Sequence, residues 1–364
     1  MRCMTVVGTR PEFIQIAPLT KGLRRRGHRE ILVNTDQHYD DNMSKAFFRD
    51  LDLPEPDINL EVGSGSHAQQ TGEIMVRLEA VMLREKPDWV VVYGDTNSTL
   101  AGALVAAKLH IPIAHVEAGL RSFDREMPEE VNRIVTDHIS DLLFAPTQTA
   151  VNNLIREGIA KGVHQVGDVR VDVLAEMTLH ASERLPVLLQ RTRLTAGEPF
   201  ALATIHRASN TDDAERLKYI VEALGGLGLP VVLPAHPRLH KMLQTFRYSF
   251  GDDVRVIEPV GFLDMVTLLN ACEIVITDSG GLQKEAYMLR RPTVTMRDST
   301  EWIETIEAGW NRLCEPVPDM FKSVVTQARA ERPSVHPDFY GTYSVSERMI
   351  DLLEQENTEA HRRI

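Results

Sequence analysis

The sequence predicts an α/β fold with two doubly wound parallel-sheet domains. Short β-branched runs alternate with longer amphipathic segments, which is the pattern of βαβ units on a parallel sheet. This alternation runs through both halves of the chain without obvious sequence repetition. The length of 364 residues suggests two domains, at about 150 residues per domain.

The first half contains five strand candidates and five helix patterns. The expected strands are residues 3–7, 30–34, 89–93, 113–116 and 142–144. The expected helices are residues 14–26, 42–51, 67–85, 99–109 and 129–140. Because ligands in such folds bind beyond the carboxyl ends of the strands, functional side chains are expected in the turns that follow them.

The second half repeats this organisation. Strands are expected at residues 200–205, 231–233, 254–257, 274–277 and 293–296. Helices are expected at residues 212–227, 239–246, 262–270 and 282–289. A domain boundary is plausible near residues 167–172, and residues 195–199 resemble a linker.

Composition narrows the class of protein. The three cysteines are far apart and form no CxxC pair, which fits a reducing cytosol. The N-terminus shows no apolar signal core, and no apolar run is long enough to span a bilayer. The net charge of −12 argues against a general nucleic-acid binder but permits a local pocket for a phosphorylated ligand. We therefore expect a soluble, cytoplasmic protein with neither a nucleic-acid nor a membrane partner.

The first strand is followed by GTRPE, in which Arg10 precedes a helix that starts near Pro11. An arginine beside the free N–H groups of a helix start can bind a phosphate. A solvated surface arginine is the alternative.

Carboxylates follow two neighbouring strands. Asp95 lies in YGDTNST after residues 89–93, and Glu117 lies in HVEAGLRS after residues 113–116. Parallel neighbouring strands deliver both to one edge of the sheet, and MPEEVNR adds Glu129. Converging carboxylates can divide acid and base roles because their pKa values separate. Glu130 is expected to be a structural first-turn acid, and no ligand spacing demands a metal at His115.

The second half places histidines and glycines after its strands. His206 follows residues 200–205, and His236 follows residues 231–233. The strongest segment is TDSGGLQKEA, in which paired glycines let the backbone approach an anion at a helix start. Glu285, one turn later, could accept hydrogen bonds from ribose hydroxyls.

The segment GSGSHA, residues 63–68, matches the GxGxxA pattern of dinucleotide sites and precedes a helix pattern. It does not occupy the first βα turn, and a segment containing Pro54 and Pro56 precedes it instead of a clear buried strand. An NAD site there is the minor alternative.

Taken in order, GTRPE, YGDTNST, HVEAGLR, PEEVNR, HR, TDSGGLQKEA and RDSTE resemble motifs of the non-hydrolysing UDP-N-acetylglucosamine 2-epimerases. The resemblance implies two Rossmann-like domains in the glycosyltransferase B architecture, with a UDP-sugar in the interdomain cleft. It also implies a homodimer and no cofactor or metal. The expected domains are residues 1–168 and 169–344, with the helix at residues 345–364 packing back on the first.

The family's chemistry explains the residue types. UDP is eliminated across C1–C2 to give a 2-acetamidoglucal, and it is added back after C2 is protonated on the opposite face. Proton transfer requires carboxylates near the sugar ring, and the departing diphosphate requires cationic or N–H hydrogen-bond donors. By motif position, the resemblance assigns acid/base roles to Asp95, Glu117 and Glu129, with His206 near the diphosphate. It assigns substrate and nucleotide binding to Arg10, Gln15, His236, Phe262, Ser279, Gly280, Gly281, Glu285 and Trp302.

The sequence departs from the family pattern at four positions. Gln15 and Trp302 stand where lysine and arginine are usual, Ser209 changes HRxEN, and Asp36 replaces a turn glycine. The segment EWIETIEAGWNRL resembles the branch that acts on UDP-2,3-diacetamido-2,3-dideoxyglucuronate, so that sugar is an alternative substrate. A hydrolysing epimerase, a glycosyltransferase of the same architecture and a non-catalytic UDP-sugar-binding regulator are further alternatives.

Overall fold

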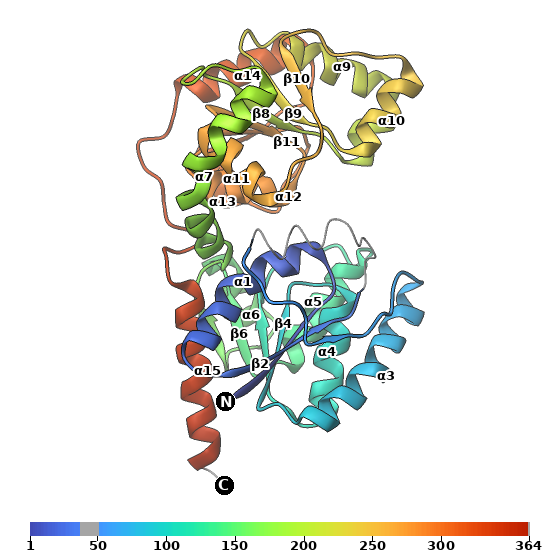
Figure 1. The fold of residues 1–364 in the computed structure, drawn as a ribbon, viewed down its shortest axis with the longest axis vertical. Coiled ribbons are helices and arrows are strands. Elements are labelled where there is room, and N and C mark those ends of the chain that lie inside the picture. The colour runs from blue at the N-terminus through green and yellow to red at the C-terminus, as the bar shows by residue number, and fades with distance from the viewer. Residues whose placement is uncertain (37–50, 363–364) are drawn as a thin grey trace. The chain divides into compact units, whose positions relative to one another are not determined.

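The computed structural model describes residues 1–36 and 51–362, and Figure 1 shows how their helices and strands are arranged. The chain forms two compact units: unit 1 comprises Met1–Val173 and Asp338–Ile364, and unit 2 comprises Leu174–Pro337. The helix expected at residues 42–51 lies, except for its last residue, outside the described residues. No described helix is long and apolar enough to cross a membrane.

Unit 1 is built on a seven-stranded parallel sheet with the strand order β3-β2-β1-β4-β5-β6-β7. The strands are β1 (Arg2–Val7), β2 (Arg29–Asn34), β3 (Ile58–Asn59), β4 (Trp89–Tyr93), β5 (Ile113–Val116), β6 (Leu142–Ala145) and β7 (Val163–Gln165). The helices are α1 (Arg10–Arg25), α3 (His67–Glu85), α4 (Asn97–Lys108), α5 (Pro128–Ile139), α6 (Gln148–Arg156) and α15 (Val345–Arg362).

Helices cover both faces of this sheet. Right-handed crossovers to either side of β1 place α1 on one face and α3, α4 and α5 on the other. Helices α3, α4 and α5 pack in sequence against one another, and α15 packs against α1. Alternate residues of β1, including Met4 and Val6, join Ile74 and Leu78 of α3 in the buried core.

Unit 2 is built on a six-stranded parallel sheet with the strand order β10-β9-β8-β11-β12-β13. The strands are β8 (Ala201–Thr204), β9 (Val231–Pro234), β10 (Val254–Ile257), β11 (Ile274–Thr277), β12 (Thr293–Thr295) and β13 (Asn311–Leu313). The helices are α8 (Ala208–Thr211), α9 (Ala214–Gly225), α10 (Pro237–Phe246), α11 (Phe262–Ala271), α12 (Gly280–Met288), α13 (Ile303–Glu307) and α14 (Pro318–Ala330). Two hydrophobic clusters, one for each set of alternating strand residues, form its core.

The two parallel sheets with flanking helices confirm the predicted fold class. Helix α7 (Arg170–Thr192), which begins in unit 1 and continues in unit 2, was not predicted. Helix α1 begins at Arg10, earlier than expected, because Glu12 caps its first turn by accepting the N–H groups of Gly8 (2.7 Å) and Thr9 (2.8 Å).

Candidate active site

The carboxyl ends of β4 and β5 bring Asp95 and Glu117 to one edge of the unit 1 sheet, as predicted. Tyr93 and Val116, the last residues of these strands, are register partners. Two residues here have backbone conformations in the left-handed region: Gly94 at φ 62° and Glu117 at φ 73°. Such a conformation is unusual for a glutamate, and unusual backbone of this kind is concentrated at functional sites.

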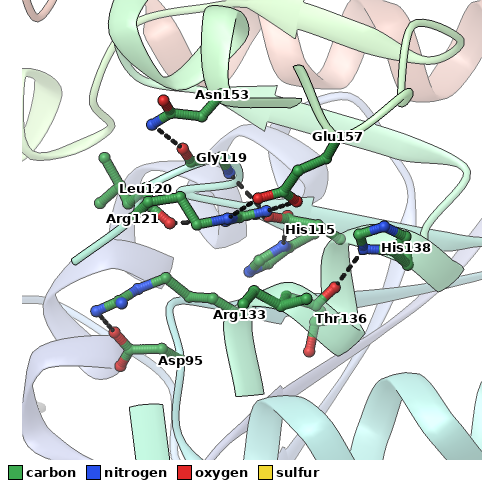
Figure 2. Close-up of polar contacts among 12 residues, drawn as sticks. Asp95, His115, Gly119, Leu120, Arg121, Arg133, Thr136, His138, Asn153 and Glu157 are labelled. Carbon is green, nitrogen blue, oxygen red and sulfur yellow. Dashed lines mark hydrogen bonds and ion pairs between the residues drawn. The ribbon is translucent and has the colours of Figure 1, made fainter. Parts of the chain in front are cut away.

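Asp95 is linked to helix α5 by Arg133. The Arg133 guanidinium donates to Asp95 Oδ2 (2.5 Å) and to Glu130 Oε2 (2.5 Å), as Figure 2 shows for Asp95. Burial raises the pKa of Asp95, and the negative charges of Glu117 and Glu129 add to this rise, whereas Arg133 opposes it. A raised pKa favours the protonated form of Asp95, which suits a carboxyl group that transfers protons.

The remaining acids differ in exposure and partners. Glu117 is half-buried, and its Oε2 accepts a hydrogen bond from Nε2 of the buried Gln15 (2.7 Å). Glu129 is exposed in the first turn of α5. Glu130 is buried and accepts the N–H groups of Ser122 and Phe123, both at 2.9 Å. It is thus structural, as expected, but it holds a loop rather than merely complementing the helix dipole.

A buried network lies behind this edge of the sheet (Figure 2). His115 contacts Asp137 through Nδ1 (2.7 Å) and the carbonyl of Gly94 through Nε2 (2.8 Å). Asp137 also accepts a hydrogen bond from the guanidinium of Arg121 (2.7 Å). Arg121 in turn forms a two-pronged ion pair with Glu157, at 2.8 and 2.6 Å. These contacts fix the turns that carry Asp95 and Glu117.

In unit 2, Asp278 fixes the loop that follows β8. Its buried carboxylate accepts the N–H groups of His206 and Arg207 and lies 2.8 Å from His206 Nδ1. Burial alone would raise the pKa of Asp278, but hydrogen bonding to His206 and the histidine's charge lower it. Because Nδ1 faces Asp278, Nε2 of the exposed His206 ring is the nitrogen better placed to meet a ligand.

The start of α12 forms a second cluster in unit 2. Ser279 is the N-cap of α12, and its hydroxyl accepts the N–H of Leu282 (3.4 Å). The indole of Trp302 donates to the carbonyl of Gly280 (2.9 Å), and Nζ of the buried Lys284 lies 4.5 Å from the centre of the Trp302 ring. A side chain at Gly280 would come within 3.4 Å of a Glu301 carboxylate oxygen. This is ordinary van der Waals contact, so the backbone at Gly280 lies close to both Glu301 and Trp302.

The other predicted residues take the following positions. His236 is the N-cap of α10, and burial and the nearby His206 lower its pKa. Phe262 is the first residue of α11, and Glu285 is buried in α12 with Gly281 one turn before it. Arg10 is the first residue of α1. No group of three or more His, Cys, Asp or Glu side chains among the described residues could hold a metal ion.

Comparison with known proteins identifies the family of this chain. A sequence model described as UDP-N-acetylglucosamine 2-epimerase matches residues 21–354. The chain belongs to the UDP-N-acetylglucosamine 2-epimerase family.

Two relatives within this family differ in substrate name. The UDP-2,3-diacetamido-2,3-dideoxy-D-glucuronate 2-epimerase of Pseudomonas aeruginosa is 45% identical over 360 residues, covering 97% of this chain and 99% of the relative. The UDP-N-acetylglucosamine 2-epimerase of Methanocaldococcus jannaschii is 42% identical over 363 residues, with the same coverage of both chains. Sequence identity alone does not separate the two substrates.

The crystal structure of the M. jannaschii UDP-GlcNAc 2-epimerase in complex with UDP-GlcNAc and UDP has a TM-score of 0.85 and 41% identity to this chain. The match covers 98% of this chain and 100% of the M. jannaschii chain. A calicheamicin glycosyltransferase with 14% identity and a TM-score of 0.56 shares the fold alone, which is the glycosyltransferase B architecture.

Sequence reasoning did not assign the residues that hold the 2-epimerase motifs in place, namely Arg133, Asp137 and Asp278. Arg133 had a signal, since it follows Glu129 by four residues in PEEVNR and so lies on the same helical face. Asp137, one turn further, carried no comparable signal because its partners come from other elements.

Proposed function

We propose that this protein is a non-hydrolysing epimerase that interconverts UDP-GlcNAc and UDP-ManNAc at C2 of the sugar. The observation that carries this proposal is the pairing of Asp95, whose pKa is raised, with Glu117 at one sheet edge. The family membership supports it, as does the M. jannaschii relative whose crystal structure holds UDP-GlcNAc and UDP.

The proposed reaction removes and restores UDP. A base takes the C2 proton, the C2–H electron pair forms the C1=C2 double bond, and the C1–O bond breaks with its electrons leaving on UDP. Protonation of C2 from the opposite face and re-addition of UDP at C1 give the epimer. There is no net oxidation, so no hydride acceptor is required.

The positions of the described side chains support the following proposed roles. Asp95, Glu117 and Glu129 transfer protons, because they gather at the end of β4 and β5 and influence one another's charge. Gln15 binds substrate and also orients Glu117, and Arg10, the first residue of α1, binds substrate as well. His206 stabilises the departing diphosphate. The proposed UDP-binding set in unit 2 is His236, Phe262, Ser279, Gly280, Gly281, Glu285 and Trp302.

The test is NMR of each UDP-sugar incubated with the protein in deuterated water. We expect deuterium at C2, a mixture of both epimers and no free ManNAc. Asp95→Asn should retain UDP binding but reduce exchange by about a hundredfold or more. Asp141→Asn is the matched control, since Asp141 binds the Ile113 N–H at the opposite end of β5. Turnover without C2 label contradicts the mechanism, and release of free ManNAc indicates a hydrolysing enzyme.

A second substrate is supported by the P. aeruginosa relative, which is named for UDP-2,3-diacetamido-2,3-dideoxy-D-glucuronate. The same NMR experiment with that UDP-sugar separates the candidates by relative kcat/KM. Absence of exchange with every UDP-sugar, together with retained UDP binding, would favour the regulator.

We also propose that the protein is a cytoplasmic homodimer. Its three cysteines are buried free thiols, as expected in a reducing compartment. Helix α3 exposes Val76 and Leu83, which are two turns apart on one face and could pack against a second copy. Leu83→Glu should produce monomers in light scattering, whereas Ile155→Glu, a change at an equally exposed residue of α6, should not. A monomeric unmodified protein contradicts the proposal.

A further inference from the structure

The strongest unassigned feature of unit 1 is the buried His115. It lies in the middle of the parallel sheet, and its side chain has no exposed surface. Both of its ring nitrogens face oxygen atoms: Nδ1 is 2.7 Å from Asp137 Oδ1, and Nε2 is 2.8 Å from the carbonyl of Gly94. No acid/base role in the proposed mechanism uses this residue.

The identity of these two partners fixes the protons on the ring. A backbone carbonyl can only accept a hydrogen bond, so Nε2 must carry a proton. A neutral ring would then direct the lone pair of Nδ1 at a carboxylate oxygen, which is repulsive. Nδ1 therefore also carries a proton unless Asp137 is itself protonated.

The surroundings of Asp137 favour its ionised form. Its Oδ2 accepts the Gly119 N–H (3.1 Å) and the Arg121 guanidinium (2.7 Å). Although burial alone would raise the pKa of Asp137, the charges and hydrogen bonds of His115 and Arg121 lower it. An ionised Asp137 with two donors on Oδ2 leaves Oδ1 to accept the proton of His115 Nδ1.

Charges then alternate along the network. Protonated His115, ionised Asp137, Arg121 and ionised Glu157 follow one another through contacts of 2.6–2.8 Å. Their formal charges cancel, which is how a buried imidazolium can be tolerated. Asp95 follows β4 and Glu117 follows β5, the strand that carries His115, and the Arg133 guanidinium contacts Asp95.

We propose that His115 is a positioning residue, held as an imidazolium by Asp137, that fixes the turns carrying Asp95 and Glu117. His115 donates a hydrogen bond to the carbonyl of Gly94, immediately before Asp95. Asp137 accepts a hydrogen bond from the N–H of Gly119, two residues after Glu117. This inference rests on the acid/base roles proposed above for Asp95 and Glu117.

Asp137→Asn separates charge from shape. Its amide oxygen can accept from Gly119 and Arg121, and its NH2 can donate to Nδ1 of a neutral ring protonated at Nε2. The hydrogen bonds around the turns are thus retained while the buried cation is lost. Asp141→Asn, at the opposite end of β5, is the control for loss of a carboxylate from this sheet.

The first measurement is proton–nitrogen NMR of the ¹⁵N-histidine-labelled protein, with the His115 signals assigned by their loss in His115→Gln. In the unmodified protein both ring nitrogens should carry a proton. In Asp137→Asn the ring should become the neutral Nε2–H tautomer. A neutral His115 in the unmodified protein overturns the proposal, and this readout depends on neither substrate nor turnover.

The second measurement is the rate of C2 deuterium exchange. Asp137→Asn should lower kcat by about tenfold or more with KM changed by less than about threefold. Asp141→Asn should change none of these values. A variant in which His115 becomes neutral but kcat stays unchanged overturns the positioning role. Absence of exchange in the unmodified protein refutes the proposed function instead, and the NMR result still decides the protonation of His115.

Discussion

At the scale of single residues, the balance of charge around Asp95 decides when it gives up its proton. Burial raises its pKa, Glu117 and Glu129 contribute to the rise, and only Arg133 counteracts them among the causes identified. Arg133 also binds Glu130, but that carboxylate is held independently by two backbone N–H groups. Arg133 can therefore be changed without releasing the whole loop.

Arg133→Met should raise the pKa of Asp95 further, because removing a positive charge disfavours the carboxylate form. The limb of the kcat/KM profile that belongs to Asp95 should move to higher pH. Profiles of both proteins at several pH values provide the measurement, and Arg133→Lys, which keeps a cation, should shift the limb less. Superimposable profiles for Arg133→Met would show that Asp95 does not control the rate.

The sequence predicts those parts of the site that depend on short motifs and on the order of neighbouring strands. Asp95 and Glu117 follow buried strands that pair in parallel, so their shared edge follows from strand order. Asp36, a departure from the usual glycine, has φ 61°, so the turn keeps the left-handed conformation that glycine favours. The contact between Asp278 and His206 depends on the pairing of β8 with β11. These strands lie about seventy residues apart in the chain, so local sequence patterns do not reveal the contact.

At the scale of elements, the carboxylate of Glu12 joins the starts of α1 and α4. Its Oε2 caps α1 through Gly8 and Thr9, and its Oε1 accepts the hydroxyl of Thr96 (2.7 Å), the N-cap of α4. The side chain is buried, and burial raises its pKa. Two turns that border the candidate site thus depend on one side chain.

Glu12→Ala should lower the free energy of unfolding by about 2–3 kcal/mol, since it leaves buried N–H groups without an acceptor. Glu12→Gln keeps an acceptor for those N–H groups and should cost less. Chemical denaturation followed by circular dichroism measures both changes. Equal stability of all three proteins would mean that other groups cap these turns.

Several of the elements that sequence reasoning missed have weak or interrupted signals, although the missed helices α6 and α14 are amphipathic. Strands β3, β7 and β13 have only two or three residues each and lie at or near sheet edges, where alternation is too short to recognise. Helix α7 contains Pro186, which normally argues for a helix end. The buried strands β4, β5 and β11 matched their predicted ranges because runs of mostly apolar residues mark them.

At the scale of the whole molecule, the C-terminal segment of the chain completes unit 1. Helix α15 packs on α1, where Ile350 approaches Gly22 so closely that a side chain there would clash with it. Around this contact, Arg26 forms ion pairs with Glu347, Asp351 and Glu354. Such exposed ion pairs contribute little each, so the buried apolar side chains of α15 are expected to dominate its docking.

Ile350→Ala should therefore destabilise unit 1 by about 2–5 kcal/mol, because it opens a cavity under α15. Hydrogen–deuterium exchange should show faster exchange in α1 and β1, more than 300 residues away in sequence, with unit 2 unchanged. Val325→Ala, at a buried position in α14, is the matched change in unit 2 and should give the converse pattern. Loss of protection in both units after either change would mean that the two units unfold as one cooperative block. Separate losses would show that the C-terminal helix stabilises the unit that carries Asp95 and Glu117.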